Sequence, residues 1–279
     1  MDDANANQIT YWNDAPGRTW ADLQDQLDIQ LEPMGAAVLA ALALRSRERV
    51  IDVGCGCGQT TLALAEAVGP EGLALGIDIS APMLSVARAR SAGRPQVRVL
   101  EADAQTYPFD PGSFDALHSR FGVMFFDDPT AAFANLRKAL KPGGRLAFLC
   151  WRTPAENPIM TLPMAAAAKH LPPPEPTTPG APGPFAFADA ERVRAILASA
   201  GFADVDLAPQ DMPAGGNALD AALDLALRVG PLGRMLREHP EADRDAAVAD
   251  VRAALAAHAR PDGRVFMDSA TWIVTARNP

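Results

Sequence analysis

Between Arg49 and Trp151, short runs rich in Val, Ile and Leu alternate with segments of helical pattern. The apolar runs are RVIDVG, LALGIDIS, VRVLEAD, FDALHS and RLAFLCW, and helical segments such as TTLALAEAVG and PTAAFANLRKALKPGG lie between several of them. Strands that are apolar along their length are buried on both faces, and connecting helices cover the faces of a parallel sheet. The alternation therefore predicts an α/β fold with a doubly wound, mostly parallel sheet.

After Trp151 the pattern changes. A helical segment around residues 158–170 leads into LPPPEPTTPGAPGP, whose prolines and glycines predict an extended surface loop. Further on, ADVDLAP and ATWIVTARN have the composition of two last strands, and the stretch between them has the pattern of two or three helices. These shifts predict a sheet domain with a helical cap that is built from separate segments.

The predicted division of the chain has four parts. They are an N-terminal helical cap segment at 1–48, the core at 49–151, a helix and Pro-rich cap loop at 152–187, and the remainder of the core at 188–279 with a helical cap insertion at about 217–260.

Charge and composition exclude several classes of function. The formal net charge is -9 and no run of Lys or Arg is present, so a nucleic acid backbone would be repelled. The chain starts with MDDANANQIT, which lacks the basic end and apolar stretch of a secretory signal, and no apolar run is long enough to cross a bilayer. We expect a cytoplasmic protein without nucleic acid partners or membrane insertion, either a monomer or a homodimer.

The stretch VIDVGCGCGQTT joins the first predicted strand to the first helix. Cys55 and Cys57 lack a second pair of ligands for a structural zinc site, so we expect no metal and assign both to packing. Gly54, Gly56 and Gly58 have the spacing G-x-G-x-G, whereas the dinucleotide fingerprint is G-x-G-x-x-G. The loop has no glycine at the third position of that fingerprint, which argues against a dehydrogenase. Without Cβ atoms the three glycines still let a ligand approach the backbone, and the helix N-terminus that follows offers free N–H groups to a carboxylate or a phosphate.

Carboxylates end the next two predicted strands. Asp78 follows the glycine loop by about 20 residues, the spacing at which an acid accepts both hydroxyls of a ribose. Asp103 ends the third strand, where its carboxylate and the N–H of Ala104 match the exocyclic amine and a ring nitrogen of adenine. Open parallel sheets bind ligands at the carboxyl ends of their strands, so these groups together indicate a nucleoside. The alternative for each Asp alone is to cap the helix or turn that follows.

Five segments in this order resemble the consecutive motifs of class I S-adenosylmethionine-dependent methyltransferases: VIDVGCGCG, GIDIS, EADAQTYPF, FDALHSRFGVMFF and LKPGGRLAFLCW. The resemblance covers roughly residues 49–151 and includes quinone- and small-molecule-methylating branches. It implies a Rossmann-like sheet with an antiparallel last strand and S-adenosyl-L-methionine as the cofactor. The cofactor contacts that it implies are Asp52, Gly54, Gly56, Gly58, Thr60, Asp78, Ile79, Met83, Asp103, Ala104, Ser119, Arg120 and Phe121.

The expected activity is direct in-line transfer of the methyl group to a small, largely apolar molecule. A sulfonium leaving group is already activated, so alignment and exclusion of water supply much of the acceleration. His118 is the candidate general base, with structural packing as its alternative. Arg120 either orients an anionic group or forms an ion pair. The candidate substrate and cap residues, for which core packing is the alternative, are Tyr11, Trp12, Trp20, Met160, Met164 and Phe185.

The sequence leaves two alternatives open. DDPT at residues 127–130 has the pattern of a helix N-terminus, although Asp127, Asp128 and Asn135 also resemble magnesium ligands. A protein with this fold could also act by binding alone, as a sensor or an assembly partner. The sequence identifies neither the methyl acceptor nor the type of atom that is methylated.

Overall fold

The computed structural model describes residues 5–172, 178, 180–238 and 241–279. Its centre is a seven-stranded sheet with the strand order β3-β2-β1-β4-β5-β7-β6. The strands are β1 Arg49–Val53, β2 Leu73–Asp78, β3 Val97–Glu101, β4 Phe114–Arg120, β5 Leu140–Trp151, β6 Ala203–Ala218 and β7 Arg264–Arg277. The first five strands pair in parallel, and β7 is antiparallel to both β5 and β6. The predicted fold class, a mostly parallel sheet with antiparallel last strands, is confirmed.

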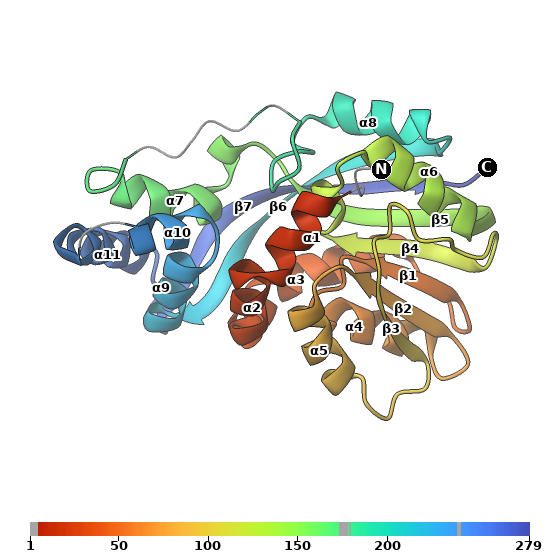
Figure 1. Cartoon of the computed structure of the whole chain (residues 1–279), viewed down its shortest axis with the longest axis horizontal. Coiled ribbons are helices and arrows are strands. Elements are labelled where there is room, and N and C mark those ends of the chain that lie inside the picture. The colour runs from red at the N-terminus through yellow and green to blue at the C-terminus, as the bar shows by residue number, and fades with distance from the viewer. Residues whose placement is uncertain (1–4, 173–177, 179, 239–240) are drawn as a thin grey trace.

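Helices cover the sheet, and a further group of helices lies at one end of the molecule (Figure 1). They are α1 Ala6–Asn13, α2 Ala15–Asp22, α3 Gln24–Leu42, α4 Gln59–Val68, α5 Ala81–Arg90, α6 Pro129–Ala139, α7 Pro158–Ala167, α8 Ala190–Ser199, α9 Leu219–Arg228, α10 Pro231–Glu238 and α11 Glu241–Ala256, with short 3-10 helices η1 Val123–Phe125 and η2 Pro154–Glu156. In Figure 1, α7, α9, α10 and α11 gather at the far end of the long β6–β7 ribbon. Helix α2 packs against both α3 and α5, so the N-terminal segment lies beside the sheet edge that carries the glycine loop.

The β6–β7 ribbon is longer than the sequence pattern predicts. Pairing runs from Ala203 opposite Arg277 to Ala218 opposite Arg264, whereas ADVDLAP and ATWIVTARN mark only part of it. The sequence pattern does not predict the additional length, because it contains Pro213, Gly215 and Gly216, and proline and glycine are rare in strands. β6 is the last strand of the sheet, so one of its edges has no neighbouring strand. A proline, which has no backbone N–H to donate, is tolerated in such an edge strand.

The segments after β5 include the stretch between β6 and β7 and the Pro-rich loop. Among the described residues, three helices lie between β6 and β7, where the pattern of residues 217–260 predicts two or three. The Pro-rich loop at 172–184 lies partly outside the described residues. In the part of the chain that the structure describes, no helix has the length and apolar character to span a membrane. The boundaries of the four-part division stay a prediction.

The DDPT segment begins α6. The side chain of Asp128 accepts a hydrogen bond from the backbone N–H of Ala131 at 2.9 Å, and Pro129 takes the first helical position. Asn135 donates to the carbonyl oxygens of Ala104 and Tyr107 and so holds the loop after β3. Among the described residues, no group of three or more His, Cys, Asp or Glu side chains is arranged to hold a metal ion.

Candidate active site

The glycine loop turns sharply between β1 and α4. Gly54, Gly56 and Gly58 have φ angles of 68°, 53° and 83°, a region that other residues rarely adopt. A Cβ atom on Gly54 would lie 2.6 Å from the Cα of Gly122. The end of β1 therefore touches the turn after β4, and this contact needs glycine on both sides.

Asp78 holds the glycine loop from the end of β2. Its two carboxylate oxygens accept hydrogen bonds from the backbone N–H groups of Gly56, at 2.8 Å, and Ser80, at 2.9 Å. Burial raises the pKa of Asp78, and the N–H donors offset part of that increase. The carboxylate thus fixes the loop and also closes the turn after its strand, which was the alternative role for this residue.

Asp103 has one engaged oxygen and one without a partner. Its Oδ1 accepts from the side chain of Asn5 and from the backbone N–H of Gln105, both at 2.9 Å. Its Oδ2 is buried and has no hydrogen-bond partner among the described residues. Asn5 in turn accepts from the N–H of Asp127 at 2.6 Å. The sequence carries no local signal for this role of Asn5, because 98 residues separate it from Asp103.

A cavity of about 230 Å³ opens above the glycine loop and the ends of β2, β3 and β4. It brings together most of the predicted cofactor contacts: Gly54, Gly56, Thr60, Asp78, Ile79, Met83, Asp103, Ala104, Arg120 and Phe121. From the predicted cap set it is lined by Trp12, Trp20 and Met160. The predicted residues Asp52, Gly58, Ser119, Tyr11, Met164 and Phe185 are not part of this lining. Met164 and Phe185 instead pack against the hydrophobic core, which was their alternative role.

The geometry does not support His118 as a general base. Its side chain is fully buried beneath the cavity and does not line it. Its Nδ1 lies 2.8 Å from Asp52, and the other oxygen of Asp52 accepts from the hydroxyls of Thr60 and Thr61. The reason is that β4 continues to Arg120, where it pairs with Leu149, so His118 lies below the rim of the sheet. His118 and Asp52 form a buried unit that holds the first turn of α4.

Arg120 lies on the rim. It lines the cavity and donates to the side-chain oxygen of Gln59 and to the carbonyl oxygen of Leu31. Burial lowers its pKa, and the charge of the nearby Asp28 opposes this effect. In the described part of the chain, no carboxylate forms an ion pair with Arg120, so its guanidinium is a half-buried cation whose hydrogen-bond partners are neutral.

The cysteines of the loop are thiols at neutral pH. Burial raises the pKa of Cys55 well above its usual value and that of Cys57 to about 12. Cys55 packs against β2, where a Cβ on Gly76 would lie 2.9 Å from its sulfur. Neither cysteine has the low pKa that a nucleophilic thiolate needs.

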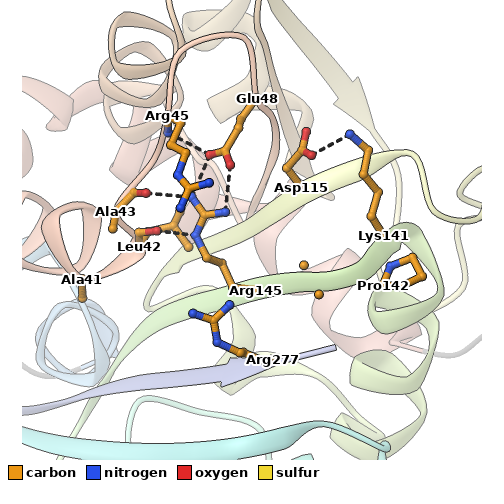
Figure 2. A pocket seen from close by; sticks show the side chains of 12 residues that line it. Ala41, Leu42, Ala43, Arg45, Glu48, Asp115, Lys141, Pro142, Arg145 and Arg277 are labelled. Atoms are coloured by element: carbon orange, nitrogen blue, oxygen red, sulfur yellow. Dashed lines mark hydrogen bonds and ion pairs between the residues drawn. The ribbon is translucent and has the colours of Figure 1, made fainter. Parts of the chain in front are cut away.

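The second cavity, of about 300 Å³, lies at the opposite end of the strands (Figure 2). There Arg145 donates to the last carbonyl oxygens of α3, Leu42 and Ala43, and forms an ion pair with Glu48 at 2.7 Å. Figure 2 shows Lys141 reaching Asp115 in the same way, at 2.6 Å. The bonds of Arg145 attach the end of α3 to β5, and the Lys141–Asp115 pair joins β5 to β4, so both have a structural role.

The sheet order, the glycine loop and the two carboxylates are arranged as in open α/β sheets that bind a ligand at the carboxyl ends of their strands. Residues 50–144 match the family described as "Methyltransferase domain". This part of the chain is therefore similar to methyltransferase domains, in agreement with the resemblance that its motifs carry.

Individual relatives agree with this assignment. The demethylmenaquinone methyltransferase of Staphylococcus aureus is 37% identical over 112 residues, which cover 40% of this chain and 46% of the relative, so the match spans about half the length of that protein. Among solved structures, the YcgJ protein of Bacillus subtilis has a TM-score of 0.57 at 16% identity and covers 87% of this chain and 97% of its own. Phosphoethanolamine N-methyltransferase 2 of Haemonchus contortus, solved with S-adenosyl-L-methionine, has a TM-score of 0.55 at 19% identity and covers 88% and 52%. These two structures share the fold.

Proposed function

We propose that the protein is an enzyme that transfers a methyl group from S-adenosyl-L-methionine to a small, largely apolar molecule. The observation that carries the proposal is the composition of the cavity. Its lining combines polar groups, among them Asp78, Asp103 and the glycine loop, with aromatic and Met side chains, among them Trp20 and Met160. A cofactor and an apolar acceptor can therefore meet in one enclosure.

The residues present fit the cofactor in three places. Asp78 offers two acceptor oxygens to a ribose diol, and the unpartnered Oδ2 of Asp103 suits an adenine amine. The half-buried guanidinium of Arg120, near the N-terminus of α4, suits the carboxylate of the amino acid part. The Haemonchus contortus neighbour was solved with the same cofactor, which supports its assignment here.

The bound cofactor supplies a methyl group on a positively charged sulfur, which leaves with the electron pair of the C–S bond. The protein aligns the acceptor with that carbon and excludes water. The N-terminal segment is fixed for this purpose by bonds to the loop after Asp78. Asn13 donates to the carbonyl oxygen of Ile79 and accepts from the N–H of Ala81, and Ser80 donates to the carbonyl oxygen of Trp12. These bonds join the N-terminal segment to the loop that follows Asp78.

Charge and similarity support a small acceptor. The net charge of -9 disfavours nucleic acid, and the Staphylococcus aureus relative is a demethylmenaquinone methyltransferase. We place the reaction in the cytoplasm and leave the acceptor atom open.

The test is to incubate the purified protein with S-adenosyl-L-methionine and fractionated metabolite pools and to measure S-adenosylhomocysteine. We expect product in at least one low-molecular-mass fraction. Cofactor binding without product in any fraction would favour the alternative, a sensor or assembly partner. Product only with intact protein or nucleic acid would overturn the small-molecule acceptor.

A further inference from the structure

The second cavity, at the end of the strands opposite the active site, has an excess of positive charge. Four basic and two acidic side chains line it: Arg45, Lys141, Arg145, Arg277, Glu48 and Asp115. The whole chain, by contrast, has a formal net charge of -9. A concave surface with an excess of one sign of charge concentrates ions of the opposite sign, so this cavity attracts anions.

Both carboxylates of the cavity are already engaged. Glu48 accepts hydrogen bonds from two guanidinium nitrogens of Arg145, at 3.0 and 2.7 Å, and from the backbone N–H of Arg45 at 2.8 Å. Asp115 accepts from the ammonium group of Lys141 at 2.6 Å and from the first backbone N–H of β1 at 2.9 Å. These two acidic groups neutralise Arg145 and Lys141, so the positive excess belongs to the other two basic side chains.

The guanidinium groups of Arg45 and Arg277 have no anionic partner. Neither group forms a hydrogen bond or an ion pair with a described residue. Arg277 also lies directly opposite Arg145 in the antiparallel β5–β7 pair, where like charges repel each other. Figure 2 shows contacts drawn from the Arg145 side chain and none from that of Arg277. A bound anion would offset this repulsion and give both free guanidinium groups an acceptor.

The backbone that carries these arginines is held in place without a ligand. Asn278, the residue after Arg277, is buried, and its side chain donates to two carbonyl oxygens at the start of β5, at 2.9 and 3.0 Å. Its backbone also exchanges two hydrogen bonds of 2.8 Å with the Gly143–Gly144 turn. On the other side of the cavity, the backbone of Arg45 is fixed by its bond to Glu48. Donors on a fixed backbone lose less freedom when they bind a ligand.

We propose that the second cavity binds a small anion with two negative charges, a phosphate monoester or a dicarboxylate, between Arg45 and Arg277. A guanidinium group donates two parallel hydrogen bonds to a phosphate or a carboxylate, and two such groups match the charge of a dianion. The volume of about 300 Å³ is that of a small-molecule pocket. The cavity shares no lining residue with the active-site cavity, so this inference goes beyond the proposed function and does not depend on it.

The experiment measures binding of three probes to the full chain by calorimetry at pH 8, with S-adenosylhomocysteine present to occupy the active site. Methyl phosphate and succinate are dianions, whereas dimethyl phosphate has nearly the shape of methyl phosphate but a single charge. Wild-type protein should bind at least one dianion roughly three- to tenfold more tightly than dimethyl phosphate. Higher affinity for methyl phosphate assigns the site to phosphate monoesters, and higher affinity for succinate assigns it to dicarboxylates.

Two variants test the residues. Arg45→Gln and Arg277→Gln each remove a positive charge that has no described partner, so both proteins should fold and bind the dianion roughly three- to tenfold more weakly. The matched control is Arg264→Gln, an exposed arginine of the same strand β7 that pairs with Asp262 at 2.7 Å outside the cavity, and it should leave the affinity unchanged. Thermal unfolding and cofactor affinity are measured on each variant to check the fold.

The outcomes are decisive for this cavity alone. No binding of either dianion, equal affinity for dianions and dimethyl phosphate, or unchanged affinity in either Arg45→Gln or Arg277→Gln would overturn the inference. Loss of dianion binding in Arg120→Gln, with binding retained in Arg277→Gln, would place the anion in the active site and also overturn it. Formation of S-adenosylhomocysteine from metabolite pools, which tests the proposed function, is measured independently.

Discussion

Gly54 and Gly122 lie backbone against backbone at the floor of the cavity. A Cβ on Gly122 would lie 2.8 Å from the Cα of Gly54 and 2.6 Å from the carbonyl oxygen of Val53. The contact joins the carboxyl ends of β1 and β4, which are neighbours in the sheet. It also forces Phe121 into its left-handed conformation, because the chain must turn back at once to bring Gly122 against the loop.

Gly122→Ala should therefore push the β4 turn away from the glycine loop. Gly122 itself has a φ of -76°, so the effect is steric alone. We expect a loss of about 1–3 kcal/mol in the free energy of unfolding, typical of overpacking, with weaker cofactor binding. Urea denaturation measures the free energy of unfolding, and calorimetry measures the affinity for the cofactor. Gly183→Ala is the control, since nothing lies within 4 Å of its added Cβ. Equal behaviour of both variants would contradict the steric argument.

Asp78→Ala removes the two acceptor oxygens proposed for the ribose and releases the N–H of Gly56. Loss of hydrogen bonds to a charged group should weaken binding of S-adenosyl-L-methionine by at least about 1.5–3 kcal/mol. The control is Glu101→Ala, because Glu101 pairs with Asp78 in register but is exposed. Calorimetric affinity that is unchanged in a folded Asp78→Ala protein would refute the assignment.

His118→Ala tests whether this residue supports structure or catalysis. It removes one partner of the buried Asp52 carboxylate, so the free energy of unfolding should fall by about 1–3 kcal/mol. Turnover of the remaining folded protein should change by less than tenfold, since a general base contributes roughly 10²- to 10⁴-fold. Turnover is measured at saturating acceptor, below the unfolding temperature. A hundredfold loss of turnover with unchanged stability would show that His118 acts as a general base.

Replacing Cys55 and Cys57 by Ser should preserve activity, because both cysteines are protonated packing residues. With a pKa of about 12, Cys57 should react with iodoacetamide at pH 8 far more slowly in the folded than in the unfolded protein. Mass spectrometry follows the alkylation, and elemental analysis of the wild type should give no stoichiometric zinc. Bound zinc or an inactive double variant would show that the pair has a chemical role.

The Glu48–Arg145 pair in the second cavity predicts a dependence of stability on pH. Burial raises the pKa of Glu48, but hydrogen bonds from Arg145 and from the backbone N–H of Arg45 outweigh it, so the pKa lies below the ordinary 4.5. Ionised Glu48 therefore stabilises the fold above pH 4.5, and this contribution is lost as the pH falls through the lowered pKa.

Glu48→Gln should accordingly reduce the free energy of unfolding by about 1.5–3 kcal/mol at pH 7. The difference from the wild type should shrink as the pH falls below 4.5. Urea denaturation across this range measures it. Glu66→Gln, which breaks an exposed pair with Arg94, should have almost no effect at either pH. A constant difference between wild type and Glu48→Gln at all pH values would contradict the linkage.

The sequence by itself determined the class of fold and the edge of the sheet at which the cavity lies. Apolar runs alternating with helical segments require a parallel sheet, and in such a sheet the residues after each strand meet at one edge. Gly54, Asp78 and Asp103 follow three neighbouring strands and indeed line one cavity. Local order in the chain was sufficient for these residues because the strand ends themselves bring them together.

The tertiary structure decided where strands end and which distant segments close the site. The sequence pattern places His118 at the rim, but pairing with β5 continues β4 as far as Arg120. His118 therefore lies two residues before the end of the strand, at about 3.3 Å of strand length per residue, and its imidazole is buried. Asn5 reaches Asp103 and Trp151 reaches Phe121 across long stretches of chain. Such contacts depend on the packing of whole elements, which local propensity and periodicity do not encode.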